Sequence, residues 1–105
     1  MAPTAIRVVK KDDYDGDYIK KYDTSTINSF GLVGERCDPD TIKWINKHFP
    51  HVIINDTWWQ TETGWPICCN LLNEKVFGPV YPTLPGSVTK AIPGYDVQIL
   101  DDDHK

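Results

Sequence analysis

The chain has 105 residues, of which 40% are hydrophobic and 25% charged, and its 11 basic and 15 acidic side chains give a formal net charge of -4. This composition is typical of a soluble globular domain and excludes a disordered or fibrous chain. The mild acidity argues against nucleic acid or an anionic membrane as the main partner, because neutralising phosphates requires clustered Lys and Arg. The length allows one modest core but leaves little room for two large substrate sites.

The cysteines and the apolar pattern indicate an intracellular protein, mitochondrial or cytoplasmic. No apolar run is long enough to span a membrane, and residues 1–11 lack the uninterrupted apolar core of a secretory signal. Cys37, Cys68 and Cys69 are an odd count, and the two adjacent cysteines are too constrained to bridge each other easily. We therefore expect reduced thiols.

The first quarter of the chain predicts a short helix and a polar connection. Ile6 and Val9 recur at near-helical spacing after Pro3, which suits a first helical turn, so we expect a helix over residues 3–11. Residues 12–25 are polar and read as a surface connection that leads into a turn of helix near residues 23–26.

Residues 30–56 predict a parallel β-α-β unit. Phe30 to Val33 form a short apolar strand that ends at Gly34, and residues 51–56 contain a β-branched run that predicts a fully buried strand. Between them, Asp38 and Pro39 read as the N-cap and first position of a helix, which Pro50 ends. Two strands joined by one helix most simply pair in parallel.

The last third of the chain predicts antiparallel β structure. Prolines and glycines separate short apolar pieces, which is typical of hairpins with tight turns; the positions are Pro66, Gly78, Pro79, Pro82, Pro85, Gly86, Pro93 and Gly94. Residues 95–100 alternate apolar and polar side chains and predict a strand, and the three aspartates that follow begin a turn. A hairpin turn without a second strand indicates that the chain is an internal piece of a longer protein.

Ligands of parallel β-α-β units bind beyond the carboxyl ends of the strands, so the segments 34–36 and 56–64 are expected at the same edge of the sheet. The second segment holds two tryptophans, three threonines and two carboxylates in nine residues. An aromatic face can stack on a base, hydroxyls can bind phosphate oxygens and a carboxylate can ligate Mg²⁺. The alternative is that Trp58 and Trp59 are core or interface aromatics and that the threonines suit a strand end.

The segment Asp56-Thr57-Trp58-Trp59-Gln60-Thr61-Glu62-Thr63-Gly64 resembles the signature of the AMP-forming short-chain acyl-CoA synthetases, which belong to the adenylate-forming superfamily. The order and spacing of three further segments support the resemblance over essentially the whole chain: residues 2–7, residues 34–38, and residues 86–97. The resemblance implies an α/β segment of the large N-terminal domain of such an enzyme. It also implies that ATP or AMP, Mg²⁺ and CoA are the cofactors and co-substrates, with a small carboxylate as the acyl donor.

The resemblance also implies roles for individual residues in nucleotide binding. Gly34, Glu35 and Arg36 would form one wall of the adenine pocket, and Trp58 would stack on the opposite face of the base. Asp56 would accept a hydrogen bond from the adenine amino group. Thr61 would hold the α-phosphate and Glu62 would ligate Mg²⁺, which makes these two the implied catalytic residues. Thr57 and Gln60 would complete the nucleotide-binding set.

Val33 and Trp59 are implied to line the acyl pocket. Related long-chain enzymes have a small residue at the place of Trp59, so an indole there would exclude longer chains and favour acetate or propionate. Arg36 differs from the proline usual in acetyl-CoA synthetases, and together with residues 64–67 it favours propionate. Thr89 stands where many relatives have glycine.

The family's phosphate loop and the lysine of its C-terminal domain are not found in the sequence, so the remainder of an enzyme chain is expected to be required and the segment alone inactive. Two rival interpretations remain: a truncated remnant that binds AMP weakly or folds against a partner, and a binding module that uses Trp58 and Trp59 as a stacking platform. Calcium at residues 12–17, zinc at the Cys and His side chains, and glycosylation at Asn55 are disfavoured by spacing and context.

Overall fold

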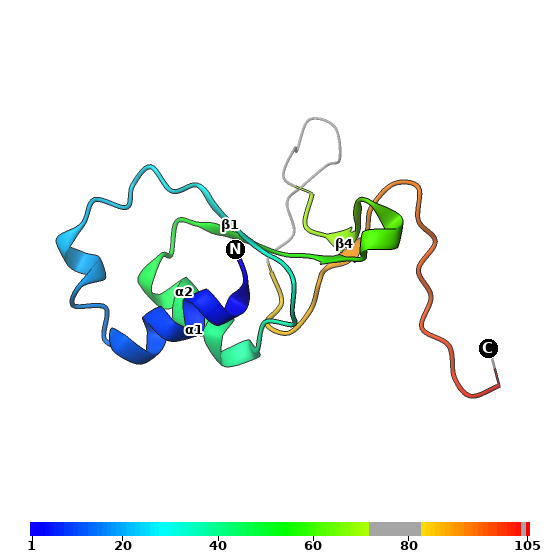
Figure 1. The fold of residues 1–105 in the computed structure, drawn as a ribbon, viewed down its shortest axis with the longest axis horizontal. Helices are drawn as coiled ribbons and strands as arrows, with labels where there is room; N and C mark the ends of the chain where they lie inside the picture. Colours follow the sequence, from blue (N-terminus) through cyan, green and yellow to red (C-terminus); the bar gives the residue numbers. More distant parts are fainter. Residues whose placement is uncertain (72–82, 104) are drawn as a thin grey trace.

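The computed structural model describes residues 1–71, 83–103 and 105. The described elements follow the chain in this order: α1 (Pro3–Asp12), the 3-10 turn η1 (Ile19–Lys21), β1 (Ser29–Leu32), α2 (Pro39–His48), β2 (Ile53–Asp56), β3 (Trp58–Trp59), the 3-10 turn η2 (Thr61–Thr63), β4 (Pro66–Cys69) and β5 (Lys90–Ala91). They form a parallel pair of strands covered by two helices and, further along the molecule, a small antiparallel sheet (Figure 1).

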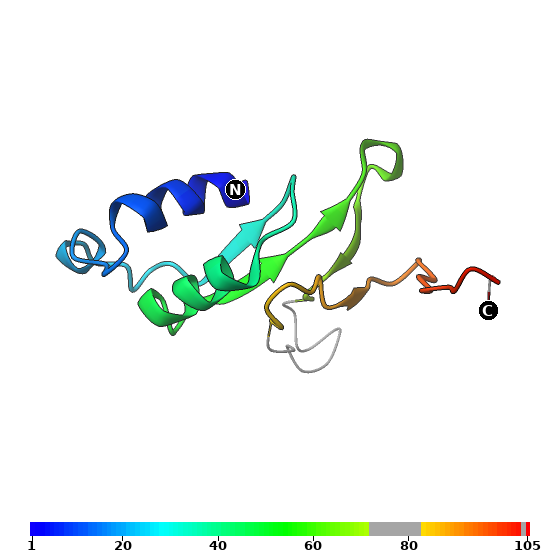
Figure 2. The same ribbon diagram turned by 90° about the horizontal axis from the view of Figure 1, so that it is seen from below.

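The parallel β-α-β unit is confirmed. Strand β1 pairs with β2 in parallel, with Ser29 opposite Ile53 and Leu32 opposite Asp56. Helices α1 and α2 lie on the same face of this pair (Figures 1 and 2). The core between them contains Ile42 and Ile45 of α2, which are fully buried.

Both helices begin at a proline, as the sequence predicts. Pro39 follows Asp38, whose carboxylate accepts hydrogen bonds of 2.9 Å from the amide and from the hydroxyl of Thr41. These bonds satisfy an amide that the first turn of a helix leaves unpaired. Although burial opposes it, the bonds from Thr41 and Arg7 lower the pKa of the Asp38 carboxyl to about 2, so this cap is charged at neutral pH.

The prediction that residues 51–56 form a fully buried strand is wrong in part. The strand begins at Ile53, whose side chain is 37% exposed, whereas Ile54 is buried. Successive side chains of a strand point to opposite faces, and the helices cover only one face of this pair. The apolar run therefore predicted the strand correctly, but the prediction that both faces of the strand are buried is wrong.

The second sheet has the antiparallel order β3-β4-β5, with Cys68 opposite Trp58 on one side and Ala91 on the other. This confirms the antiparallel prediction for the last third of the chain. The predicted turns at Gly78, Pro79 and Pro82 lie outside the described residues.

Two predicted elements are wrong. Residues 95–100 do not form a strand; Ile99 is 98% exposed, and alternation alone cannot hold a strand without a neighbour to pair with. The 3-10 turn lies at Ile19–Lys21, whereas the stretch predicted to be helical holds a non-helical turn, closed by a 3.0 Å hydrogen bond from the Ile27 amide to the Thr24 carbonyl. The Asp13 carboxylate accepts hydrogen bonds from the amides of Tyr18 and Ile19 and thereby fixes the start of this turn.

Among the described residues, no helix is long and apolar enough to cross a membrane.

Candidate functional site

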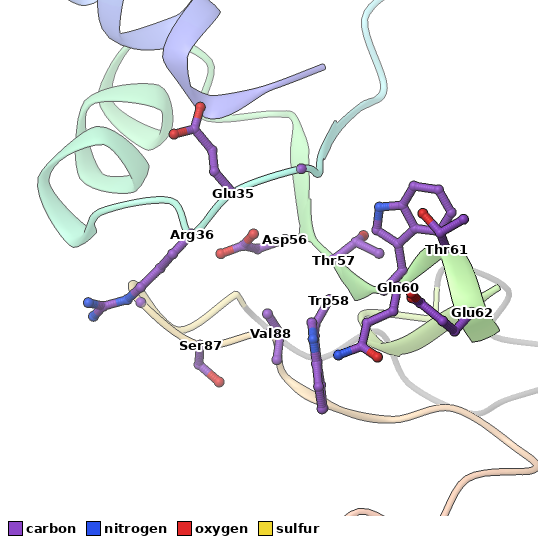
Figure 3. A pocket seen from close by; sticks show the side chains of 13 residues that line it. Glu35, Arg36, Asp56, Thr57, Trp58, Gln60, Thr61, Glu62, Ser87 and Val88 are labelled. Carbon is purple, nitrogen blue, oxygen red and sulfur yellow. The ribbon is translucent and has the colours of Figure 1, made fainter. Parts of the chain in front are cut away.

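The two segments predicted to meet do lie together, at the carboxyl ends of β1 and β2. They line a pocket of about 1000 Å³ (Figure 3). The lining residues come from three stretches of the chain: Gly34, Glu35 and Arg36; Asp56, Thr57, Trp58, Trp59, Gln60, Thr61 and Glu62; and Gly86, Ser87 and Val88. This volume suits a ligand of the size of a nucleotide.

Asp56 is the buried carboxylate of the pocket. It is the last residue of β2 and only 2% of its surface is exposed. Burial raises the pKa of the Asp56 carboxyl, while the Thr57 amide and the positive charge of Arg36 act in the opposite direction. In Figure 3 its carboxylate lies between the Arg36 segment and Thr57. A buried carboxylate at this place can accept a hydrogen bond from a donor on a bound ligand.

Trp58 and Trp59 form β3 and both line the pocket; the two residues are 41% and 43% exposed. An irregularity in the pairing of β3 with β4 falls between them, so the two side chains do not follow a simple strand alternation. The indole of Trp58 extends beside Val88 (Figure 3). Neither tryptophan is part of the core of the described residues, which removes a core role as the explanation for this pair.

Thr61 and Glu62 are carried by the turn η2, on the opposite side of the pocket from Arg36 (Figure 3). The Thr63 hydroxyl donates a 2.8 Å hydrogen bond to the carbonyl of Gln60, and Gly64 ends the turn in a left-handed conformation with a φ of 63°. Only glycine adopts this conformation routinely. The turn is therefore built by its own residues, which leaves Thr61 and Glu62 exposed beside the pocket.

Two predicted site residues are placed differently from the others. Val33 is not among the residues that line the pocket. Glu35 is on the lining, but its carboxylate turns toward α1 (Figure 3), where it accepts hydrogen bonds from the amide and hydroxyl of Thr4 and lies 3.1 Å from Arg7. The wall at this place is therefore formed by the segment 34–36 without the Glu35 carboxylate facing the cavity.

Cys37 follows this wall, and its thiol is completely buried. Burial, reinforced by the negative charges of Asp56 and Asp38, raises the pKa of the Cys37 thiol to about 11. The thiol is protonated at neutral pH and is not a nucleophile there.

Sequence reasoning missed the third stretch of the lining, Gly86 to Val88. The sequence predicts a turn at Gly86 but does not place this turn at the pocket. Gly86 has a φ of 87°, and a Cβ atom there would lie 3.3 Å from the ring of Pro39. The signal available in the sequence was the glycine itself, because glycine adopts a positive φ and allows close approach of the backbone to another segment.

Thr89, next to this loop, is strained. Its φ is 72°, and it is the one non-glycine residue with positive φ among the described residues. The hydroxyl of Thr89 is buried and has no hydrogen-bond partner among the described residues. A β-branched residue in this conformation costs about 1 to 2 kcal/mol, which explains why glycine would suit this position.

We expect Thr89→Gly to stabilise the complete protein by about 1 kcal/mol, because glycine relieves the strain and removes a buried hydroxyl but adds chain entropy to the unfolded state. Chemical denaturation measures the change. Thr26→Gly is the control, since Thr26 is an exposed turn residue and has no positive φ. A destabilised Thr89→Gly variant would show that the threonine makes a contact worth more than the strain.

Comparison with known proteins identifies the family. The model of the family described as "AMP-binding enzyme" matches residues 1–105. Acyl-CoA synthetase short-chain family member 3, mitochondrial, of Bos taurus is 42% identical over 104 residues, which cover 96% of this chain and 14% of the relative. The acetyl-coenzyme A synthetase of Methanothrix soehngenii is 40% identical over 104 residues, which cover 97% of this chain and 14% of the relative.

A solved structure agrees with the sequence relatives. The crystal structure of an acyl-CoA synthetase from Brucella canis superposes with a TM-score of 0.68 at 27% identity and covers 99% of this chain and 17% of that one. The chain thus spans about one seventh of the length of the curated relatives named above. Because the family model matches this chain from its first residue to its last, the chain belongs to the AMP-binding enzyme family.

Proposed function

We propose that this chain forms the base-binding half of the active site of an AMP-forming short-chain acyl-CoA synthetase. The observation that carries the proposal is the pocket at the carboxyl ends of β1 and β2, which combines a buried carboxylate, exposed indoles and a hydroxyl and carboxylate on a turn. The two relatives are named as an acetyl-coenzyme A synthetase and a short-chain acyl-CoA synthetase, which supports the same chemistry.

In this proposal the adenine lies between the segment 34–36 and the indole of Trp58. Asp56 accepts a hydrogen bond from the adenine amino group, and Thr57 and Gln60, which directly precede and follow β3, contact the nucleotide. Stacking of a base on an aromatic side chain contributes about 1 to 3 kcal/mol. The exposure of Trp58 and the burial of Asp56 support this assignment, because the indole is accessible to a ligand and the carboxylate can accept in a low dielectric.

The proposed reaction has two steps. A carboxylate oxygen of the acid attacks the α-phosphorus of ATP and pyrophosphate leaves; the sulfur of CoA then attacks the acyl carbonyl and AMP leaves. Thr61 would hold the α-phosphate and Glu62 would supply a carboxylate oxygen to Mg²⁺, an ion that would supply positive charge to offset the negative charge of the leaving group. The described residues contain no group of three or more His, Cys, Asp or Glu that could hold a metal. A single carboxylate fits Mg²⁺ that is bound mainly by substrate phosphates and water.

Propionate or acetate is the proposed acid, with propionate favoured. Trp59 lines the pocket and would occupy the space that a longer acyl chain needs. The compartment is proposed to be intracellular, and the bovine relative carries the word mitochondrial in its name. We also propose that the remainder of the enzyme chain is required, because triphosphate binding and the second step need groups that these residues do not supply.

The test is the exchange of labelled pyrophosphate into ATP by the complete protein that carries these residues. Exchange that depends on propionate or acetate and on Mg²⁺ is the expected result. If the folded protein shows no exchange with propionate and none with acetate, the proposal is wrong. Binding of sugars or aromatic compounds without Mg²⁺ would instead favour a stacking module built on Trp58 and Trp59.

A further inference from the structure

A single arginine outside the pocket ties helix α1 and the start of helix α2 to the pocket wall. We propose that Arg7 is a positioning residue that sets the affinity for the nucleotide by holding the segment 34–36 in its binding conformation. This inference rests on the proposed function, because it concerns the same pocket. Arg7 is not among the residues that line the pocket and therefore acts through others.

The guanidinium of Arg7 uses all of its nitrogens. Nε donates to the Asp38 carboxylate at 3.0 Å, and Nη1 donates to the Thr4 hydroxyl at 3.0 Å and to the Glu35 carboxylate at 3.1 Å. Nη2 donates to the carbonyl of Arg36 at 3.2 Å. We call this set the Arg7 clamp: Thr4, Arg7, Glu35, Asp38 and the Arg36 carbonyl. A lysine has one nitrogen and cannot reach four acceptors in these directions.

The clamp holds a segment that has little packing of its own. Gly34, Glu35 and Arg36 are exposed, and Gly34 has a φ of 102° with open space where a Cβ would lie. The hydrogen bonds at Glu35 and at the Arg36 carbonyl fix the segment from the side that faces α1. Without them, the wall of the pocket would exchange among several conformations, of which one is competent to bind.

The charges of the clamp reinforce its geometry. The hydrogen bonds to Asp38 and then to Glu35 raise the pKa of Arg7, and the bonds from Thr4 and then Arg7 lower the pKa of Glu35. Both partners are therefore charged at neutral pH, and hydrogen bonds between charged groups are stronger than neutral ones. The side chains of Arg7 and Glu35 are each 37% exposed, so solvent screens part of this attraction, and the clamp depends mainly on the number and directions of its hydrogen bonds.

The clamp also explains why the Glu35 carboxylate turns away from the cavity. It is occupied by Thr4 and Arg7, both from α1, which lies 28 or more residues earlier in the chain. The conformation of the wall is thus coupled to the docking of α1, and Arg7 connects that docking to ligand binding.

The test is the kinetic analysis of Arg7→Gln in the complete protein. We expect the KM for ATP in pyrophosphate exchange to rise about tenfold, the value for losing charge-assisted hydrogen bonds, while the KM for propionate and kcat at saturating ATP change less than about twofold. An unchanged KM for ATP, or a fall in kcat alone, would overturn the proposal. Arg7→Lys should recover only part of the affinity.

Two further variants keep the test decisive. Lys11→Gln removes one positive charge from an exposed position on the same helix and should leave the KM for ATP unchanged. If Arg7→Gln does not fold, Thr4→Ala decides, because it removes a hydroxyl that bonds both Glu35 and Arg7. We expect a rise of about threefold in the KM for ATP from Thr4→Ala, and no rise would overturn the proposal.

Calorimetry with AMP separates this inference from the proposed function. If the unaltered protein binds AMP but shows no acid-dependent exchange, the proposed reaction fails, and an increased Kd for AMP in Arg7→Gln still supports the clamp. If Arg7→Gln binds AMP as tightly as the unaltered protein, the clamp fails and the proposed function stands. If the unaltered protein does not bind AMP, both fail.

Discussion

Replacing Glu62 by alanine in the complete protein is expected to lower Mg²⁺-dependent pyrophosphate exchange by about two to three orders of magnitude. The expected size is that of removing one group that stabilises developing charge in a transition state. Glu62 lies on the turn η2, lines the pocket and is exposed, as the proposed role in holding Mg²⁺ requires. The effect should fall on kcat, because the charge that Mg²⁺ neutralises grows as pyrophosphate departs.

The fold should survive this change, since Glu62 is exposed and surface substitutions typically alter stability by about 0.5 kcal/mol or less. Asp102→Ala removes an exposed carboxylate outside the pocket lining and serves as the matched control. Exchange by Glu62→Ala at the unaltered rate and with unaltered Mg²⁺ dependence would remove the metal-binding role from this residue.

Trp59→Gly is expected to change the preferred length of the acid. Removal of the indole opens a space on the pocket lining, and each methylene that a longer acid then buries contributes about 0.8 kcal/mol. Octanoate carries five more methylenes than propionate, so burial of part of them should raise the ratio of kcat/KM for octanoate to that for propionate about 100-fold. Exchange assays with propionate, butyrate and octanoate measure this ratio.

The neighbouring tryptophan provides the control for chain length. Trp58→Ala removes the stacking surface for the base and should raise the KM for ATP about tenfold or more, while the order of preference among the three acids stays the same. A Trp59→Gly variant with the original preference would show that this indole does not limit the acyl pocket.

Local signals in the sequence predicted the first half of the fold. The Asp38-Pro39 pair starts a helix by itself, and two short apolar runs separated by that helix can hardly pair except in parallel. Those signals also placed residues 34–36 and 56–64 at one edge of the sheet, because the carboxyl ends of parallel strands meet there, and the second segment lines the pocket as far as Glu62.

The features that sequence did not predict all depend on distant partners. Residues 95–100 alternate as a strand would but have no neighbouring strand among the described residues to pair with. Ile53 was predicted to be buried but is exposed, because no second layer of described residues covers its face of the sheet. The return of Gly86 to the pocket and the orientation of Glu35 toward Arg7 depend on contacts between separate parts of the chain. Such contacts leave no periodic pattern in a single sequence.

A crystal structure of the complete protein with AMP bound would test the assignment of the pocket. We expect the adenine between the segment 34–36 and the indole of Trp58, with its amino group within hydrogen-bonding distance of the Asp56 carboxylate. The α-phosphate should lie beside Thr61. AMP bound at another place, or in this pocket with the base away from Asp56 and Trp58, would show that these residues do not form the base-binding site.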